Sequence, residues 1–327
     1  MPTCATIPTG RVTPIGATWC EPIMNDTPIQ VRDFRKVYGN FVAVDGISFE
    51  ARRGEIFGLL GPNGAGKTST LETLEGLRAS DGGALRVMGV DPTRDARKLR
   101  DLIGVQLQTS GLPENMTPGE AMRFFCAYHG AAPRPDLLER LGLAEKMSTQ
   151  YYMLSTGQKR RLALALAVAH NPPVVFLDEP TAGLDVATRI ELHDMMRELK
   201  AAGTTIILAT HDMAEAEKMA DRVAILLRGK IAASGTPREL TAAGSGFTKV
   251  SVRTEGQSLA GPVTFPGVAQ QAVMDDYAVY FTTDVGPTVS AILAHIQAQG
   301  DALVDLRVER PSLEERFLEI TAVGAAR

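Results

Sequence analysis

The sequence predicts an α/β protein with a doubly wound core, because strand and helix patterns alternate and polar residues follow the strands. Three apolar runs alternate with two helical stretches in the second half of the chain. The runs are 173–177, 204–209 and 222–227, and the helical stretches are 187–202 and 213–220. The first two runs are continuously apolar, as in strands of a parallel sheet that helices cover. Such sheets bind ligands at the carboxyl ends of their strands.

A glycine-rich turn follows an earlier apolar run, Ile56–Leu60, and precedes a helical pattern. It matches the phosphate-binding pattern G-x-x-x-x-G-K-[ST] at every fixed position. Its residues are Gly61, Pro62, Asn63, Gly64, Ala65, Gly66, Lys67 and Thr68, and Ser69 follows directly. Glycines let backbone N–H groups close on phosphate oxygens, and a helix N-terminus adds favourable partial charge. We expect Lys67 to reach the β- and γ-phosphates and the Thr68 hydroxyl to bind Mg²⁺.

Two acidic residues, Asp178 and Glu179, end the run 173–177. At the end of a buried strand, this is the Walker B arrangement of nucleotide-binding proteins. We expect Asp178 to hold Mg²⁺, through water, and Glu179 to act as general base toward the attacking water. Two acidic residues at the start of a loop are common and would not by themselves indicate catalysis. The phosphate loop upstream favours the catalytic interpretation.

The totals favour two domains in an ordinary globular protein. The chain has 327 residues, of which 44% are hydrophobic and 22% charged. Its net charge of −4 gives no electrostatic reason to expect nucleic-acid binding. No apolar run approaches the roughly 18–20 residues of a membrane span. Cys4, Cys20 and Cys126 lack metal-ligand spacing, which favours a reducing compartment without disulfides or zinc.

The chain divides by pattern into a tail and two domains. Residues 1–28 are expected to be a disordered tail, with Met24 as a hypothetical natural start. Residues 29–241 form the nucleotide-binding domain, with a helical insertion at about 109–153, and 247–327 form a small α+β domain after a glycine-rich linker. The first domain is expected to contain antiparallel strands at 29–34, 41–50 and 83–89, a helix at 95–102, a strand at 103–108, and helices within 117–139 that are interrupted near 130–135. The second is expected to contain strands at 247–252, 272–281 and 302–308, a helix at 288–298 and a closing helix at 311–320.

The segment Leu154-Ser155-Thr156-Gly157-Gln158 separates this chain from most phosphate-loop proteins. Ser155 and Gln158 form a capping-box pattern, so a helix N-terminus that can face a phosphate is expected here. The simpler interpretation is a structural helix cap. With the motifs above, the sequence resembles the ATP-binding cassette (ABC) transporter ATPases, whose signature is L-S-G-G-Q. Thr156 departs from that signature, whereas Gly157 keeps close backbone approach open.

The resemblance implies roles for four more residues, in the family's order along the chain. Tyr38 corresponds to the aromatic residue that stacks on adenine, and Gln108 to the Q-loop residue that touches Mg²⁺ and the membrane partner. Asp185 corresponds to the D-loop, and His211 to the histidine that contacts the γ-phosphate. The implied catalytic set is Lys67, Gln108, Glu179 and His211. Ser155, Gly157 and Gln158 are implied to bind the ATP held by a second chain.

The resemblance implies an ATP-hydrolysing subunit that drives separate transmembrane subunits from the cytoplasmic face of the membrane, where it is peripheral. Two copies, as a homodimer or with a relative as a heterodimer, would enclose ATP and Mg²⁺. The segments 229–240 and 311–318 resemble ATPases of drug exporters, which favours export. One alternative is a soluble ABC ATPase acting on ribosomes or DNA, although the chain has one cassette and no basic patch. The other is a nucleotide-sensing regulator, against which Glu179 and His211 argue.

Overall fold

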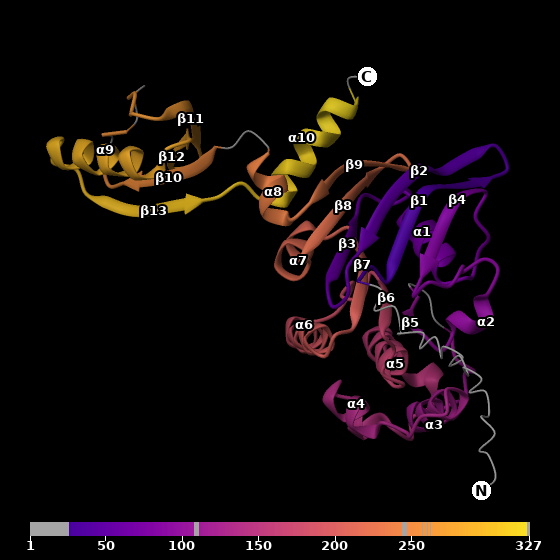
Figure 1. Ribbon diagram of the computed structural model, residues 1–327. Helices are drawn as coiled ribbons and strands as arrows, with labels where there is room; N and C mark the ends of the chain where they lie inside the picture. The colour runs from indigo at the N-terminus through magenta and orange to yellow at the C-terminus, as the bar shows by residue number, and fades with distance from the viewer. Residues whose placement is uncertain are drawn as a thin grey trace, which may run out of the picture.

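The computed structural model describes residues 26–107, 111–243, 247–256, 258–259, 261 and 263–325. These residues form a large mixed sheet, a three-stranded antiparallel sheet beside it and a four-stranded sheet near the C-terminus (Figure 1). Residues 1–25 lie outside the described part, so the expected tail and the start at Met24 fall there. Residues 26–28 are attached to the fold, since Arg53 N donates to Asp26 O at 3.0 Å and Met88 N to Pro28 O at 2.7 Å.

The large sheet confirms the predicted doubly wound core. Its strand order is β5-β6-β7-β3-β8-β9. The parallel strands are β5 (Ile103–Gln106), β6 (Val174–Asp178), β7 (Thr205–Thr210), β3 (Ile56–Leu60) and β8 (Arg222–Leu227). The sequence analysis did not include the last strand, β9 (Lys230–Gly235), which turns back antiparallel to β8 at Arg228 and Gly229.

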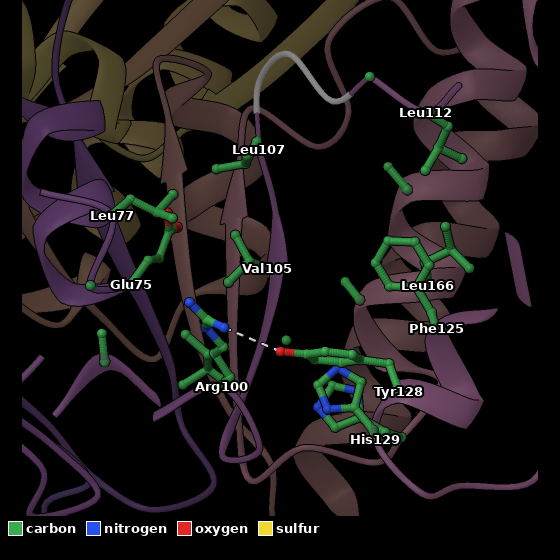
Figure 2. A pocket seen from close by; sticks show the side chains of 18 of the residues that line it. Glu75, Leu77, Arg100, Val105, Leu107, Leu112, Phe125, Tyr128, His129 and Leu166 are labelled. Carbon is green, nitrogen blue, oxygen red and sulfur yellow. Dashed lines mark hydrogen bonds between the residues drawn. The ribbon is translucent and has the colours of Figure 1, made fainter. Parts of the chain in front are cut away.

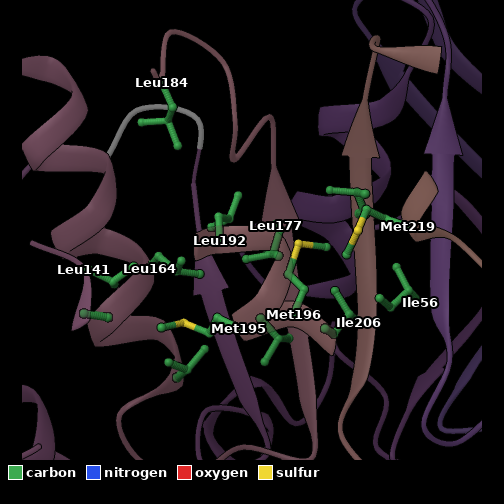
Figure 3. Close-up of a cluster of buried hydrophobic side chains, with 14 of the residues drawn as sticks. Ile56, Leu141, Leu164, Leu177, Leu184, Leu192, Met195, Met196, Ile206 and Met219 are labelled. Atoms are coloured by element: carbon green, nitrogen blue, oxygen red, sulfur yellow. The ribbon is translucent and has the colours of Figure 1, made fainter. Parts of the chain in front are cut away.

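Consecutive side chains of the parallel strands point into two different cores. Leu177 and Ile206 belong to a core that the helices of one face complete with Met195 and Met196 (Figure 3). Phe176, one residue before Leu177, belongs to the core on the opposite face. The helices of the first face are α5 (Thr156–Val168), α6 (Val186–Ala201) and α7 (Met213–Met219), and the opposite face carries α1 (Lys67–Leu74) and the short α2 (Ala96–Leu99). Burial on both faces explains why these strands are continuously apolar.

Two smaller units flank this core, as predicted. The antiparallel sheet has the order β2-β1-β4, with β1 (Ile29–Tyr38), β2 (Phe41–Ala51) and β4 (Gly82–Val87). The insertion contains α3 (Pro118–Tyr128), α4 (Pro135–Arg140) and two short 3₁₀ turns, η1 (Ala144–Lys146) and η2 (Tyr151–Met153). Gly130, with φ of 65°, lies between α3 and α4 and accounts for the predicted interruption.

The C-terminal sheet differs from the prediction at one hairpin. Residues 272–281 were expected to form one strand, but the chain turns at Asp275 and Asp276, and Asp275 has a left-handed φ of 51°. The strands are β10 (Thr248–Thr254), β11 (Val268–Met274), β12 (Tyr277–Thr282) and β13 (Leu303–Glu309), in the order β11-β12-β10-β13. Helix α9 (Val285–Ala298) packs on one face through Ile292 and Ile296. Aspartate tolerates left-handed backbone, so this pair can close a tight hairpin without glycine.

The closing helix returns to the nucleotide-binding core. Helix α10 (Leu313–Ala325) lies beside α7 and α8 (Pro237–Ala242), away from the four-stranded sheet (Figure 1). Leu313 is fully buried in the core of the large sheet, and its N–H donates to Glu217 Oε2 at 3.0 Å. The proposed domains are 29–241 and 247–327, and helix α10 of the second packs on the first.

The described helices are short. The longest, α6, has 16 residues and carries charged side chains on its exposed face. Within the part of the chain that the structure describes, no helix is long and apolar enough to cross a membrane.

Gly104 provides a test of this packing. A Cβ added there would lie 2.0 Å from the carbonyl oxygen of Ala167, at the end of α5. Backbone cannot yield as a flexible side chain can, so we expect Gly104→Ala to destabilise the domain by about 3 kcal/mol in urea unfolding. Gly111→Ala is the control, because nothing lies within 4 Å of its added Cβ. Equal stability of the two variants would contradict the contact between β5 and α5.

Candidate functional site

The phosphate loop runs from the end of β3 to the start of α1, and two glycines fix its path. Gly61 has φ of 153°, and a Cβ there would lie 2.4 Å from Leu226 O. Gly66 has φ of 106°, and a Cβ there would lie 2.7 Å from Ala43 O. Gly66 is also the N-cap of α1 and provides no side-chain cap. The first N–H groups of the helix therefore remain available to an anion.

Lys67 lies on the floor of the site, with only 6% of its surface exposed. Its Nζ donates to Gly61 O at 2.6 Å and to Pro62 O at 3.3 Å, and it lies 3.7 Å from Glu179 Oε1. Burial lowers the pKa of this amine, while the carboxylates of Glu179 and Asp178 act in the opposite direction. The ammonium is thus held at the loop by carbonyl and carboxylate oxygens.

Thr68 and Asp178 meet as a candidate Mg²⁺ site. The Thr68 hydroxyl donates to Asp178 Oδ2 at 3.0 Å. Asp178 Oδ1 is buried and has no hydrogen-bond partner among the described residues. Burial raises the pKa of the Asp178 carboxyl, and the hydrogen bond from Thr68 opposes that effect. A hydroxyl beside a carboxylate with an unused buried oxygen fits the oxygen ligands that Mg²⁺ prefers.

Glu179 connects two strand ends. Its backbone is left-handed, with φ of 51°, and its N–H donates to Ala209 O at 2.9 Å. One carboxylate oxygen faces Lys67, and the other lies 2.7 Å from Nδ1 of His211. The carboxylate is buried, whereas the His211 side chain is 57% exposed. A strained backbone held at a site of this kind is typical of residues placed for function.

The loop, both carboxylates and two aromatic residues surround a cavity of about 260 Å³. Its lining comprises Tyr38, Phe41, Ala43, Pro62, Asn63, Gly64, Gly66, Lys67, Thr68, Ser69, Asp178 and Glu179. The Tyr38 hydroxyl donates to Ser69 Oγ at 3.3 Å. Phe41 is 63% exposed and was missed by the sequence analysis, although it directly follows the turn at Gly39 and Asn40 that begins after Tyr38. The structure thus gathers residues from three strands and the phosphate loop around one cavity.

The signature segment does not line this cavity. Ser155 is the N-cap of α5, and the predicted capping box is present: Gln158 N donates to Ser155 Oγ at 3.2 Å and Ser155 N to Gln158 Oε1 at 2.9 Å. Thr156 is exposed at the first helical position, and Gly157 is half-buried. This helix end is therefore accessible to another molecule rather than to the chain's own phosphate loop.

Two further expected residues lie elsewhere. Asp185 caps α6 and accepts hydrogen bonds from Thr188 N at 2.9 Å and Thr188 Oγ1 at 2.7 Å, and these bonds lower the pKa of its carboxyl. Neither Asp185 nor His211 is among the residues that line the cavity, and His211 reaches the site through its contact with Glu179. Gln108 lies outside the described residues, and strand β5 ends before it, at Gln106.

A second cavity, of about 410 Å³, lies between β5, the end of α1 and the helical insertion (Figure 2). Leu77, Val105, Leu107 and Phe125 give it apolar walls, and we call it the β5 groove. Arg100 and Tyr128 close one side through a hydrogen bond of 3.3 Å, drawn as a dashed line in Figure 2.

An unusual carboxyl group lies in this groove. Glu75, the C-cap of α1, is buried, and neither of its carboxylate oxygens has a hydrogen-bond partner among the described residues. Burial, with a smaller contribution from the charge of Asp178, raises the pKa of Glu75 to about 8. The groove therefore combines apolar walls with one unsatisfied acid, and sequence reasoning had no signal for it.

The sheet, the phosphate loop and the paired carboxylates define a phosphate-loop nucleoside triphosphatase. Comparison with known proteins identifies the family. The family model "ABC transporter" matches residues 44–182. The chain is 35% identical to the daunorubicin resistance ATP-binding protein DrrA3 of Streptomyces coeruleorubidus, across 91% of this chain and 97% of that protein. This chain belongs to the ABC transporter ATP-binding family.

Two other relatives and one solved structure agree. The Nod factor export ATP-binding protein I of Ralstonia nicotianae is 35% identical, across 92% of this chain and 96% of that protein. The linearmycin resistance ATP-binding protein LnrL of Bacillus subtilis is 32% identical, across 90% and 98%. A structure of the ATP-binding subunit of an ABC transporter superposes with a TM-score of 0.63 and 30% identity, covering 65% of this chain and 92% of the other.

These findings confirm the predicted function at the level of the family. The chain is the ATP-binding subunit of an ABC transporter, it hydrolyses ATP to drive transport, and it works with separate transmembrane subunits. The names of these relatives refer to drug resistance and Nod factor export, and those activities are stated of the relatives alone.

Lys67→Ala tests the phosphate loop. Lys67 is the one side-chain cation among the described residues that line the cavity, so we expect its removal to raise the Kd for ATP by about tenfold or more. Isothermal titration calorimetry measures this directly. Lys146→Ala, on an exposed 3₁₀ turn, is the matched control. Unchanged affinity would remove Lys67 from the site.

Glu75→Gln tests the buried carboxyl in the nucleotide-free subunit. Because the folded pKa is about 8 and the unfolded value is near about 4.3, the folded state holds a proton that the unfolded state loses between these values. The contribution of Glu75 to stability therefore falls as pH rises through this window. We expect the variant to be more stable than the parent at pH 9, by on the order of 3 kcal/mol. At pH 5 this gain in the free energy of unfolding should be much smaller. Urea unfolding at pH 5 and pH 9 measures the two free energies of unfolding. Glu139→Gln, which replaces an exposed acid, is the control and should leave the stability at both pH values unchanged.

Proposed function

We propose that this chain drives an exporter and that two ATPase chains, identical or related, enclose each ATP between them. The main support is the separation of two phosphate-binding features within one chain. The phosphate loop faces the 260 Å³ cavity, whereas the N-terminus of α5 with Ser155 lies outside that cavity. A second chain, placed head to tail, would bring its own Ser155 to Gln158 segment onto the exposed side of the nucleotide. The names of the relatives, which concern drug resistance and export, support the direction of transport.

The residues of the cavity divide the work. The loop N–H groups and Lys67 would hold the β- and γ-phosphates, and Tyr38 would stack on adenine. Glu179 would accept a proton from the water that attacks the γ-phosphorus as the bond to the bridging oxygen of ADP breaks. His211, oriented by its Nδ1 contact with Glu179, would offer its other ring nitrogen to the γ-phosphate. Gln108 and Asp185 remain proposed members of the site.

Thr68 and Asp178 would hold Mg²⁺, with Gln108 as the third proposed contact. The ion would neutralise phosphate charge. The Thr68 hydroxyl lies 3.0 Å from one oxygen of Asp178, and the other oxygen of Asp178 has no hydrogen-bond partner among the described residues, so one ion could reach both side chains.

The β5 groove is the proposed contact with the membrane subunit. Leu107 and Gly111 both line it, and in the sequence these residues flank the predicted Q-loop residue Gln108. Leu77, Phe124 and Tyr128 expose more than half of their surface around it, and such a cluster is typical of an interaction surface. Glu75 would receive a hydrogen-bond donor from the partner. Docking there would place the subunit at the cytoplasmic face of the membrane.

Glu179→Gln tests the base and the two-chain site together. Loss of the proton acceptor should reduce ATP turnover by about 100-fold or more while ATP still binds. The variant should therefore retain ATP through gel filtration. Glu145→Gln, at an exposed acid, is the control and should turn over normally. Hydrolysis at the parental rate would exclude Glu179 as the base.

Adding Ser155→Arg to Glu179→Gln tests the second chain. Ser155 lies outside the cavity of its own chain, so its replacement should release the retained ATP only if a partner's helix end covers the nucleotide. Retention of ATP by the double variant would contradict the enclosed arrangement. Binding of ATP to the single chain, measured at low protein concentration, should stay unchanged.

A further inference from the structure

Strand β13 ends the four-stranded sheet and leaves one side of its backbone open. Among the described strands it pairs only with β10. It carries neither lysine nor proline, and its three charged side chains, Asp305, Arg307 and Glu309, are of both signs. Three of its apolar side chains are well exposed: Leu303 at 43%, Val304 at 46% and Val308 at 44%. An edge of this composition can pair with another strand whose charges match its own.

The two faces of β13 differ in chemistry. Leu306 and Val308 pair with Val252 and Val250 of β10, whose side chains lie in the core beneath α9, so Leu306 and Val308 share that face. The register shifts between Asp305 and Leu303, and at this bulge Leu303 and Val304 both oppose Thr254, which lies on the same face as Val252. Asp305, Arg307 and Glu309 lie on the opposite face. There Arg307 Nε donates to Asp305 Oδ2 at 2.8 Å, and the Tyr277 hydroxyl donates to the same oxygen at 2.6 Å.

The sequence of β13 is complementary to itself when read in reverse. Leu306 is the midpoint of the seven-residue strand. In an antiparallel pair of two β13 strands centred on Leu306, Asp305 of each copy lies opposite Arg307 of the other. Val304 likewise lies opposite Val308. Each of the seven residues then lies opposite a residue of the other copy. At positions 304–308, every cross-strand pair joins opposite charges or two apolar side chains.

Shifted registers lose this match. Centring the pair on Asp305 places that carboxylate opposite itself, and centring it on Arg307 places two guanidinium groups face to face. The second register also sets Asp305 against Glu309. Like charges directly opposite each other oppose pairing, so the central register is the favoured one.

We propose that two copies of this chain associate through an antiparallel β13–β13 pair centred on Leu306. The two C-terminal sheets then form one eight-stranded sheet with a twofold axis at its middle, an isologous contact. On one face, four charges alternate in sign, two from Asp305 and two from Arg307. On the other face, Val304 and Val308 of both copies continue the apolar surface beside α9. This contact involves no nucleotide, so it would keep two ATPase chains together while the ATP-dependent seam opens.

Sedimentation of the full chain without nucleotide tests the contact. We expect a dimer, and we expect Val304→Lys to weaken it by about tenfold or more, because two lysines enter the seam by symmetry. Val273→Lys is the matched control: Val273 is 67% exposed on the same face, on the opposite edge strand β11. A monomeric parent at about 100 μM, or equal weakening by both lysines, would overturn the proposal.

Charge reversal and cross-linking test the register. Asp305→Arg should weaken the dimer by about tenfold, and Arg307→Asp in the same chain should restore it, because the cross-copy pairs are then exchanged rather than lost. The double variant Val304→Cys with Val308→Cys should form a disulfide-linked dimer on oxidation, whereas neither single variant should. A bond within one chain is excluded, since four residues along a strand span about 13 Å. Failure of the exchange to restore association while the double cysteine variant stays monomeric would overturn the register.

The two associations are distinguishable. Lys67→Ala removes the ATP-dependent contact and should leave the β13 dimer unchanged. Val304→Lys should leave ATP retention by Glu179→Gln intact at high protein concentration. If instead Lys67→Ala abolishes the nucleotide-free dimer, the association does not run through β13.

Discussion

The order β6-β7-β3 in the large sheet is the constraint on which the site depends. Three neighbouring parallel strands end at the same edge, so the groups that follow them meet. Lys67 follows β3, Glu179 follows β6 and His211 follows β7, and the Glu179 carboxylate contacts both of the others. The chain separates these residues by up to 144 positions, from 67 to 211. The parallel register brings these three side chains into contact.

The same helix that begins at the phosphate loop ends in the β5 groove. Helix α1 starts at Lys67, and its C-cap is Glu75. Eight residues of helix span about 12 Å, so the two cavities are separated by one rigid element. One helix therefore connects the phosphate loop with the groove that we propose as the partner contact. A buried carboxyl without a hydrogen-bond partner among the described residues is costly, so a donor from a bound partner would stabilise Glu75.

Sequence patterns predicted those features that depend on contacts between residues close together in the chain. The strand, glycine loop and helix around Lys67 and the capping box at Ser155 follow from short-range chemistry, and both are present. The hairpin at Asp275 was missed because an Asp-Asp turn without glycine does not interrupt an apolar alternation. Glu75 and Phe41 could not be found, since only tertiary packing buries the first and places the second at the cavity. Gln108, placed by resemblance, lies outside the described residues.

The four-stranded sheet is inserted between two helices of the ATPase core. The chain leaves that core after α8, and α10 packs again on α7 and α8. Leu313 fills a space in the ATPase core, and Glu217 of α7 holds the backbone of that residue. Excising everything beyond residue 243 would therefore uncover apolar surface next to the helix that follows His211, whereas removing only 247–309 and rejoining the ends would leave that surface covered.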